Sequence, residues 1–346
     1  MTGHAPALGT EQADLAAMLG AVVAGTDARL CDEKPGDVAA IRRQLAELGV
    51  WTLGASTDDS PAGDELTALA FACLARSWPA LAWASVQAHT AVDVLGDTTI
   101  SPGIQGGVTA VAVVDDNSAA VRLTLQNGRL SGCLDRIDPA GDRPHVMVLG
   151  HGAAWLLPPE VLRFESLRRT GLDGALTASA HLIKPIEEAD VVINGVDTDS
   201  ARIRLWLGAA AVAAGIADAA AETALRYSGE REQFGAPLTA LPSVRDALLS
   251  AAGSASMALR QVLRPRDCSL WQAAAVVDSA CEQALDTCAR AVQAHGGYGY
   301  LTEYHVERML RDAVSLRAAC DVVNIRRAAA AKYAAFTTMD SGKDVA

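Results

Sequence analysis

The sequence predicts a mainly α-helical protein with a small β domain in the middle of the chain. Half of the 346 residues are hydrophobic but only 4% are aromatic, so the core must consist mainly of Ala, Leu and Val, which suit closely packed helices. Runs of β-type residues with turn signals are confined to about residues 107–194. A chain of this length can form two or three domains. We therefore expect a helical N-terminal domain (1–104), a β-barrel-like middle domain (105–196), a C-terminal four-helix bundle (197–338) and a tail (339–346).

The first hundred residues contain helical segments separated by turn residues. Four helices are expected, over residues 10–24, 38–48, 65–77 and 80–95. Thr10 and Asp37 can cap the first two, and Gly49 can end the second.

The middle domain is expected to contain short strands. Candidate strands lie at residues 108–114, 121–125, 146–149 and 154–157. Asn127-Gly128 is a typical two-residue hairpin signal.

The C-terminal domain reads as a helix bundle. Its helices are expected over residues 199–228, 244–263, 270–295 and 306–335, the last with a break near 316–321. Asp199-Ser200 can cap the first of them. The small residues Gly208 to Ala211 fit either tight helix packing or a roomy cleft, and we favour packing.

Composition excludes several classes of protein. The net charge is −12, the pI is near 5.0 and no basic run is present, which disfavours nucleic-acid binding. The first residues do not read as a signal peptide, and the apolar run 205–217 is too short to cross a bilayer, which needs about 20 residues. We expect a cytoplasmic protein that does not bind membranes. Seven cysteines without a Cys-x-x-Cys pair favour reduced thiols over disulfides or a metal site.

Three polar and glycine-rich clusters interrupt the C-terminal helices. They are Arg231-Glu232-Gln233-Phe234-Gly235, Gln293-Ala294-His295-Gly296-Gly297-Tyr298-Gly299-Tyr300 and Glu307-Arg308-Met309-Leu310-Arg311-Asp312-Ala313. Glycine inside a helix costs about 1 kcal/mol relative to alanine, so the second cluster indicates close backbone approach to a ligand or a neighbouring subunit. In this order the clusters resemble the C-terminal domain of the acyl-CoA dehydrogenase family. The family pattern reads Arg-x-x-Phe-Gly, Gln-x-x-Gly-Gly-x-Gly-Tyr and Glu-Arg-x-x-Arg-Asp-Ala.

The resemblance implies FAD as the cofactor and five residues that hold its nucleotide half. Arg231 offers a guanidinium fork to the diphosphate, and Phe234 offers an apolar face to the adenine. Gln293 can both donate and accept hydrogen bonds, while Gly296 and Gly297 let backbone N–H groups come close to the ligand. In this family these residues reach across a dimer interface to an FAD whose ring sits in the other subunit.

Each of these residues also has a purely structural explanation. Arg231 can pair with Glu230 or Asp218, Phe234 can belong to a core, and the glycines can simply end a helix. Arg311-Asp312 is interpreted as an ion pair at a helix–helix junction, without a catalytic role.

The resemblance also shows what this chain lacks. In the family a glutamate removes the α-proton of an acyl thioester while the flavin accepts the β-hydrogen as hydride. That glutamate corresponds to Cys320 or, in other members, to Leu205. Asp321 is rotated by about 100° from Cys320 on a helix, and a Cys320 thiolate would need a cationic neighbour such as Arg317. We therefore predict no catalytic residue, with Cys320 and Asp321 left open as alternative bases.

The segments expected to contact the flavin ring depart from the family pattern too. Residues 113–118 replace Thr-Glu-Pro-x-x-Gly-Ser-Asp, and Arg136-Ile137-Asp138 replaces Trp-Ile-Thr/Ser. The chain therefore retains the half-site that faces a partner's flavin and departs from the pattern at its own ring site.

Three functions follow from this pattern. The first is a subunit of a heterotetrameric, FAD-dependent acyl-CoA dehydrogenase in lipid metabolism, paired with a related chain that supplies the glutamate. For such pairs the resemblance implies acyl-CoA substrates, including bulky, steroid-derived ones, and electron-transferring flavoprotein as acceptor. The second is a homomeric flavoenzyme with a relocated base, such as Asp321 or Glu303. The third is a non-enzymatic interaction protein of the same fold.

Overall fold

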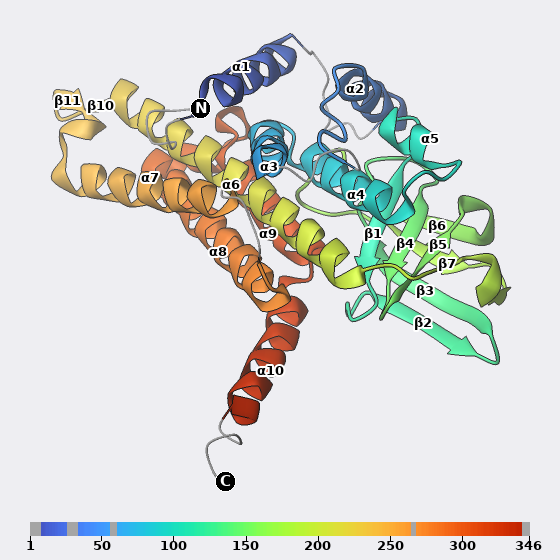
Figure 1. Cartoon of the computed structure of the whole chain (residues 1–346). Coiled ribbons are helices and arrows are strands. Elements are labelled where there is room, and N and C mark those ends of the chain that lie inside the picture. Colours follow the sequence, from blue (N-terminus) through green and yellow to red (C-terminus); the bar gives the residue numbers. More distant parts are fainter. Residues whose placement is uncertain (1–7, 26–33, 56–60, 264–267, 341–346) are drawn as a thin grey trace.

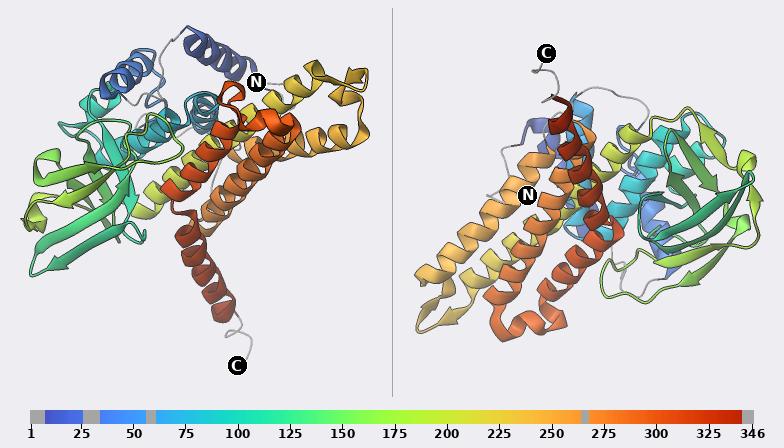
Figure 2. Two further views of the ribbon diagram at one scale, coloured as in Figure 1. Left: turned by 180° about the vertical axis from the view of Figure 1, so that it is seen from behind. Right: turned by 90° about the horizontal axis from the view of Figure 1, so that it is seen from below.

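The computed structural model describes residues 8–25, 34–55, 61–263 and 268–340. The N-terminal and C-terminal parts of the sequence form helices, and the middle part forms two β-sheets that lie to one side of these helices (Figure 1). The mainly helical fold with a small β domain is the expected one. The last helix leaves the body and projects away from it (Figure 1 and the left view of Figure 2).

The helices and strands have the following bounds. The helices are α1 (Thr10–Ala24), α2 (Pro35–Glu47), α3 (Pro61–Ala75), α4 (Pro79–Leu95), α5 (Ser101–Gln105), α6 (Thr198–Glu230), α7 (Pro242–Val262), α8 (Leu270–His295), α9 (Val306–Ala319) and α10 (Val322–Asp340). The strands are β1 (Val111–Asp115), β2 (Val121–Gln126), β3 (Arg129–Ile137), β4 (His145–Leu149), β5 (Ala153–Leu157), β6 (Leu162–Ser166), β7 (Ala178–Leu182), β8 (Ile186–Glu187), β9 (Val192–Asn194), β10 (Glu232–Gln233) and β11 (Ala236–Pro237).

The predicted helices are present, but several begin elsewhere. The α1 N-cap is Gly9, whose backbone amide bonds the Gln12 side chain, so the cap predicted at Thr10 was wrong. Asp37 lies in the first turn of α2 instead of capping it. Asp197, two residues before the predicted cap, accepts a hydrogen bond from the amide of Ser200. The predicted break in the last helix falls at residues 320–321, and most of the predicted tail lies outside the described residues.

The middle domain consists of two sheets that pack face to face. One has the order β1-β4-β5-β9, with β1 and β4 parallel, and the other has the order β2-β3-β7-β6, with β8 beside β3. Both sheets contribute to one shared apolar core, which contains Ala112, Val146 and Leu157 from the first and Leu134 and Ala180 from the second. The hairpin predicted at Asn127-Gly128 joins β2 to β3.

Helix α6 is the central element of the helical core. It is 33 residues long, and its middle is buried on every side, including the whole run from Gly208 to Ala221. By length and composition it could cross a membrane, but 83% of its apolar window is buried inside the structure, as in the core helix of a bundle. A Cβ at Gly208 would lie 2.4 Å from Val86 of α4, and one at Gly215 would lie 2.1 Å from the Ala72 carbonyl oxygen of α3. The small residues therefore serve tight packing, as favoured above.

Helix α9 is fastened to the middle domain by its Arg-Asp pair. The Asp312 carboxylate is 3% exposed and accepts a 2.6 Å hydrogen bond from the amide of Leu172 in the β6–β7 connection. Arg311 bonds Glu307 on its own helix and the carbonyl of Thr170. The structural role expected for the pair is found, but the ion pair at a helix–helix junction is wrong, since the contacts join a helix to the β domain.

The close approach along α6 gives a stability prediction. Gly215→Ala should lower the free energy of unfolding by about 1–3 kcal/mol, because its methyl group would overlap the α3 backbone. Gly229→Ala on the same helix has nothing within 4 Å of the new carbon, so it should stabilise by up to about 1 kcal/mol. Urea unfolding of both variants checks this, and equal effects at the two positions would contradict it.

The burial of Asp312 gives a pH prediction. Burial raises the pKa of this carboxyl to about 6, although the Leu172 amide opposes the shift. A raised folded-state pKa means that the group's contribution to stability is present below about pH 4 and is lost as pH rises through 6. Between pH 4 and pH 7, wild type should lose about 2–3 kcal/mol relative to Asp312→Asn, which cannot titrate. Urea unfolding across this range measures the difference, and a pH-independent difference would refute the assignment.

Candidate functional site

A cleft of about 620 Å³ lies beside the β10–β11 hairpin, and we call it the hairpin cleft. The C-terminal ends of α6 and α8, the start of α7 and the turn 296–298 form its walls. Four of the five predicted cofactor residues line it: Arg231, Gln293, Gly296 and Gly297. Residues more than sixty positions apart thus share one cleft.

Arg231 has its guanidinium group available to a ligand. It follows the last residue of α6 and lies over the ring of Tyr298, 5.3 Å from the ring centre. The structural alternatives considered for it are wrong: Asp218 pairs with Arg76, which directly follows α3, and no described ion pair joins Glu230 to Arg231. A cation held against an aromatic face, without a carboxylate partner among the described residues, suits an anionic ligand.

The two glycines of the cleft differ in why the backbone needs them. Gly296 ends α8 with φ +58°, a conformation that favours glycine. Gly297 has an ordinary φ, and a Cβ built on it would meet nothing within 4 Å. Neither conformation nor packing therefore explains Gly297, whereas Gly299 is needed because its Cβ would lie 2.6 Å from the carbonyl oxygen of Val292. An open backbone at Gly297 is what close approach of a ligand requires.

Aromatic side chains that sequence reasoning missed form one wall of the cleft. His295 is buried, stacks on Tyr227 at 4.0 Å, and donates from Nδ1 to the Ala291 carbonyl at 2.7 Å. Burial lowers the pKa of His295, so its ring is neutral at pH 7. Tyr298 and Tyr304 complete the cluster. The only sequence feature that could have indicated this aromatic wall was the pair of tyrosines in the Gly-Gly-Tyr-Gly-Tyr segment.

Phe234 lies apart from the other four predicted residues. It is 92% exposed at the tip of the β10–β11 hairpin and does not line the cleft. Phe234 and Gly235, with φ +56° and +80°, are the two loop residues of this hairpin. Such turns favour Asn-Gly, so a phenylalanine here costs conformational energy. Neither a core role nor contact with a ligand in its own cleft fits this position.

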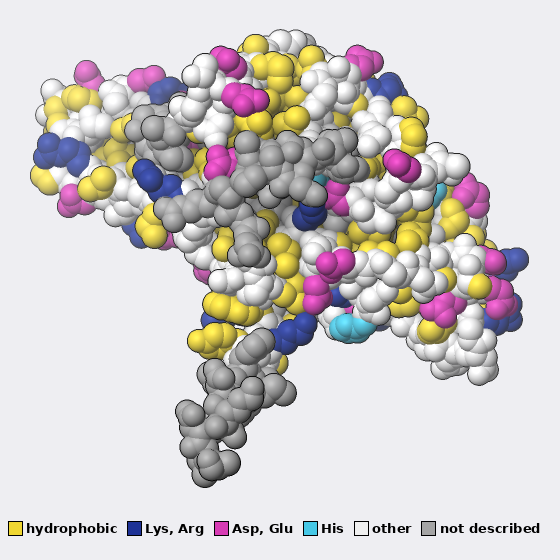
Figure 3. Space-filling model, in the orientation of Figure 1, with side chains coloured by type: hydrophobic (Ala, Val, Ile, Leu, Met, Phe, Trp, Pro, Cys, Tyr) yellow, Lys and Arg dark blue, Asp and Glu magenta, His cyan; other side chains and the backbone are white. Residues whose placement is uncertain are grey.

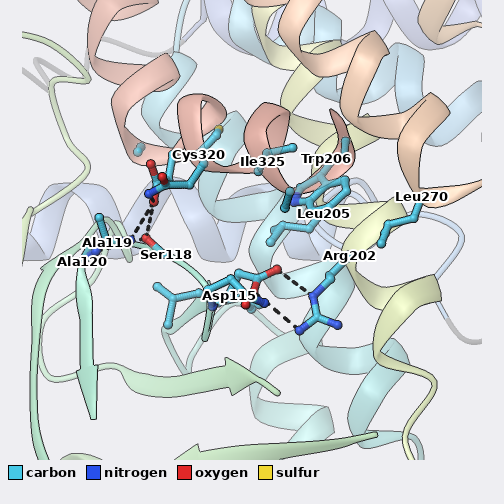
Figure 4. A pocket seen from close by; sticks show the side chains of 18 of the residues that line it. Asp115, Ser118, Ala119, Ala120, Arg202, Leu205, Trp206, Leu270, Cys320 and Ile325 are labelled. Carbon is cyan, nitrogen blue, oxygen red and sulfur yellow. Dashed lines mark hydrogen bonds and ion pairs between the residues drawn. The ribbon is translucent and has the colours of Figure 1, made fainter. Parts of the chain in front are cut away.

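A second pocket lies at the seam between the β domain and the helices, and we call it the seam pocket (Figure 4). Its volume is about 300 Å³. Both positions at which the family resemblance places a glutamate, Leu205 and Cys320, line this pocket. The departing segments 113–118 and Arg136 line it too.

Neither alternative base is suited to proton abstraction. Burial raises the pKa of the Cys320 thiol well above its usual value. The cation expected to help it, Arg317, pairs with Glu282 instead. Asp321, in the left-handed break between α9 and α10, accepts hydrogen bonds from the Ser118 hydroxyl, the Ala119 amide and the Asn324 side chain at 2.8–2.9 Å. The bonds from Ser118 and Ala119, which Figure 4 labels, join Asp321 to the β domain.

The other carboxylate in the seam pocket is also engaged. Asp115 at the end of β1 accepts a 2.7 Å hydrogen bond from Arg202 of α6, a pair that sequence reasoning missed (Figure 4). Burial would raise the pKa of Asp115, but hydrogen bonds from Arg202 and Asn117 outweigh it and leave that pKa below its usual value. Arg202 also donates to the carbonyls of Leu149 and Gly150. Glu303 is exposed and lines neither pocket.

Comparison with known sequences identifies the domain that the C-terminal part of the chain forms. Residues 205–335 match the family model described as the C-terminal domain of acyl-CoA dehydrogenase. A probable acyl-CoA dehydrogenase of Bacillus subtilis (strain 168) is 40% identical over 114 residues, which cover 30% of this chain and 29% of that protein. In sequence, the chain thus spans less than a third of this curated relative.

Comparison in structure extends over nearly the whole chain. Butyryl-CoA dehydrogenase of Megasphaera elsdenii has a TM-score of 0.76 at 21% identity, covering 94% of this chain and 99% of that one. A glutaryl-CoA dehydrogenase of Mycobacterium smegmatis in complex with FADH2 has a TM-score of 0.74 at 15% identity, covering 93% and 95%. These likenesses show the fold, and the sequence match is confined to the C-terminal domain. The motifs and the domain match therefore identify residues 205–335 as a C-terminal domain of the acyl-CoA dehydrogenase type, and nearly the whole chain has the fold of these solved enzymes.

Proposed function

We propose that this chain is a subunit of an FAD-dependent acyl-CoA dehydrogenase that holds the adenine and diphosphate end of the cofactor. A related partner chain supplies the catalytic glutamate and the site of the flavin ring. When bound, FAD supplies the acceptor for the hydride that leaves the acyl-CoA thioester. The subunits form a heterotetramer, and electron-transferring flavoprotein is the acceptor that the family resemblance implies.

The distance between the two sites is the observation that carries this proposal. Helix α6 runs from the β domain at one end to the β10–β11 hairpin at the other (Figure 1). Leu205 of the seam pocket and Arg231 of the hairpin cleft are 26 residues apart along it, or about 40 Å. An extended dinucleotide is on the order of 20 Å long, judged from ordinary bond lengths. A cofactor held at Arg231 therefore cannot place its ring in the seam pocket of the same chain.

The chemistry of the hairpin cleft fits the nucleotide end. Arg231 is available to a diphosphate, and Gly297 leaves its backbone open to close approach. Gln293 is exposed in the same cleft and can bond a base or a ribose.

The missing base supports a partner chain. In the seam pocket Asp115 and Asp321 both bond to groups of the fold, and the positions of Leu205 and Cys320 hold no carboxylate. A homomeric enzyme would need a relocated base, and the described carboxylates of this pocket do not offer one. We extend the proposal to bulky, steroid-derived acyl groups, because the resemblance implies such substrates for paired subunits.

The proposal is tested by purifying the chain alone and together with a glutamate-bearing chain of the same fold. We expect visible flavin absorbance and a heterotetrameric mass only for the co-expressed pair. Flavin bound to the single chain would favour the homomeric enzyme. Absence of flavin from both preparations would favour a non-enzymatic protein.

Arg231→Ala should remove FAD from the complex. Losing a charge-assisted contact to the diphosphate should weaken FAD by about 1.5–3 kcal/mol, or roughly 10- to 150-fold in Kd. Thermal unfolding should barely change, because no ion pair among the described residues includes this side chain, which only lies over the Tyr298 ring. Arg226→Ala, an exposed arginine near the end of α6 that does not line the cleft, is the matched control. Equal FAD affinity in the two variants would contradict the assignment of Arg231 to the FAD site.

The Phe234→Asn variant should make the free chain more stable and its complex with the partner chain weaker. Asn tolerates the left-handed conformation, so the free chain should gain about 1 kcal/mol of stability. The same change should weaken the complex with the partner chain by at least tenfold, about 1.4 kcal/mol, since an exposed aromatic anchor is lost. Phe234→Ala should weaken the complex equally without this gain. Urea unfolding and sedimentation of the mixed chains measure the two effects, and an unchanged complex would show that Phe234 lies outside the interface.

A further inference from the structure

The seam pocket contains features that the proposed function does not use. In this family's fold a flavin ring and a base would be expected there, yet the polar groups of the pocket are already bonded to one another. The Ser118 hydroxyl and the Ala119 amide, donors of the kind that ring carbonyls need, both donate to Asp321. The Arg202 guanidinium is bonded to Asp115. A flavin ring would have to break these contacts, so the pocket does not fit it.

The body of the seam pocket is nonetheless well shaped for an apolar ligand. Three tryptophans line it, two of them buried (Trp83 and Trp206) and one, Trp271, 38% exposed. Leu205 and Ile325 add aliphatic surface, and alanines of α9 and α10 leave the interior open. In Figure 4 Leu205 and Trp206 lie on the side of the pocket opposite Ser118 and Ala119. Indole faces with aliphatic side chains suit flat or branched hydrocarbon.

The mouth of the pocket carries positive charge. Lys332 on α10 is exposed at its rim, and no ion pair in the described part of the chain includes it. His151 lies on the rim as well. The other charged lining groups already have partners within the fold: Arg136 pairs with Asp138, Arg202 pairs with Asp115, and the Asp321 carboxylate accepts from three neutral donors. Lys332 is thus the charge left to meet a ligand.

The pocket is also open to a small molecule from the outside. Hydrophobic side chains are exposed where α10 leaves the body, including Val323 and Tyr333 (Figure 3). The Tyr333 ring packs against Trp271 in a tilted arrangement, with the ring centres 5.2 Å apart, which supports this wall of the pocket.

We propose that the seam pocket binds one amphipathic anion, with a ring-containing or branched apolar body among the tryptophans and its anionic end at Lys332, and does not oxidise it. This inference does not depend on FAD binding at the hairpin cleft. It assigns the pocket a binding role in place of the redox role that the fold suggests.

The test uses the flavin-free full chain and 1-anilinonaphthalene-8-sulfonate, an aromatic probe with an anionic end. We expect saturable emission at one probe per chain. Ala329→Trp, which places a large side chain in the pocket, should raise the Kd at least tenfold. Ala330→Trp, the next residue on α10, does not line the pocket and should leave the Kd within twofold. Circular dichroism and thermal unfolding show whether both variants fold.

A second pair of variants tests the charge at the mouth. Lys332→Glu should weaken the probe several-fold, and the effect should shrink with added salt. Arg327→Glu on an exposed face of the same helix should have little effect. These surface changes carry no risk of a packing defect.

Three results would overturn the proposal. They are no saturable binding, equal weakening by both tryptophan variants, and loss of probe binding in Arg231→Ala, which would place the probe in the hairpin cleft. In a flavin-loaded complex Ala329→Trp should leave the FAD content unchanged, because the ring lies elsewhere. Loss of flavin there would show that the pocket holds the ring. Absence of flavin from every complex would refute the proposed function while leaving the probe result intact.

Discussion

The rest of the structure depends on the all-round burial of α6. A helix can be buried on every side only when its side chains are small enough for neighbouring backbones to approach, and this one is mostly glycine and alanine over the turns where α3 and α4 cross it. Because its middle is fixed, its two ends are fixed as well. One end carries Arg202 into the β domain, and the other carries Tyr227 and Arg231 to the hairpin cleft. The helix thus sets a distance of about 40 Å between two chemically different sites.

Both carboxylates of the seam pocket are hydrogen-bonded to groups of the fold. A general base needs a carboxylate that faces the substrate and is free to take up a proton. Here Asp115 is held by Arg202 and Asp321 by the β1–β2 connection, so each carboxylate joins the β domain to a helix. Both bonds stabilise the domain arrangement because they satisfy groups that would otherwise be partly buried without partners. In these bonds both carboxylates accept hydrogen bonds from groups of the fold. Held in this way, neither carboxylate is free to take up a proton from a ligand in the pocket.

The sequence predicted the fold well and the site only in part, for definite physical reasons. Apolar periodicity located α8 at its observed residues, and the break at Cys320-Asp321 was foreseen because polar residues interrupt the pattern there. The starts of α2, α3 and α7 were missed by two to four residues. The caps of α1 and α6 were missed because Gly9 and Asp197 lie beside residues that are equally good caps. The clusters around Arg231 and Gln293 line one cleft. Their resemblance to a known family pattern, and not their periodicity, predicted that they share a site. The Arg202–Asp115 pair joins residues 87 positions apart, and no local pattern reports such a contact.

Phe234 and Gly297 indicate selection for something outside the folded chain. Residues that serve folding alone should agree with their local conformation and packing. Phe234 disagrees with its left-handed turn and gains no burial in return, and Gly297 gives up a side chain where both space and backbone would allow one. Each therefore carries a local cost that the isolated chain does not recover. The two residues lie on either side of Arg231, at the cleft and at the hairpin beside it. A ligand at Gly297 and a second chain at Phe234 would offset both costs together, which is the arrangement expected of a half-site completed by another subunit.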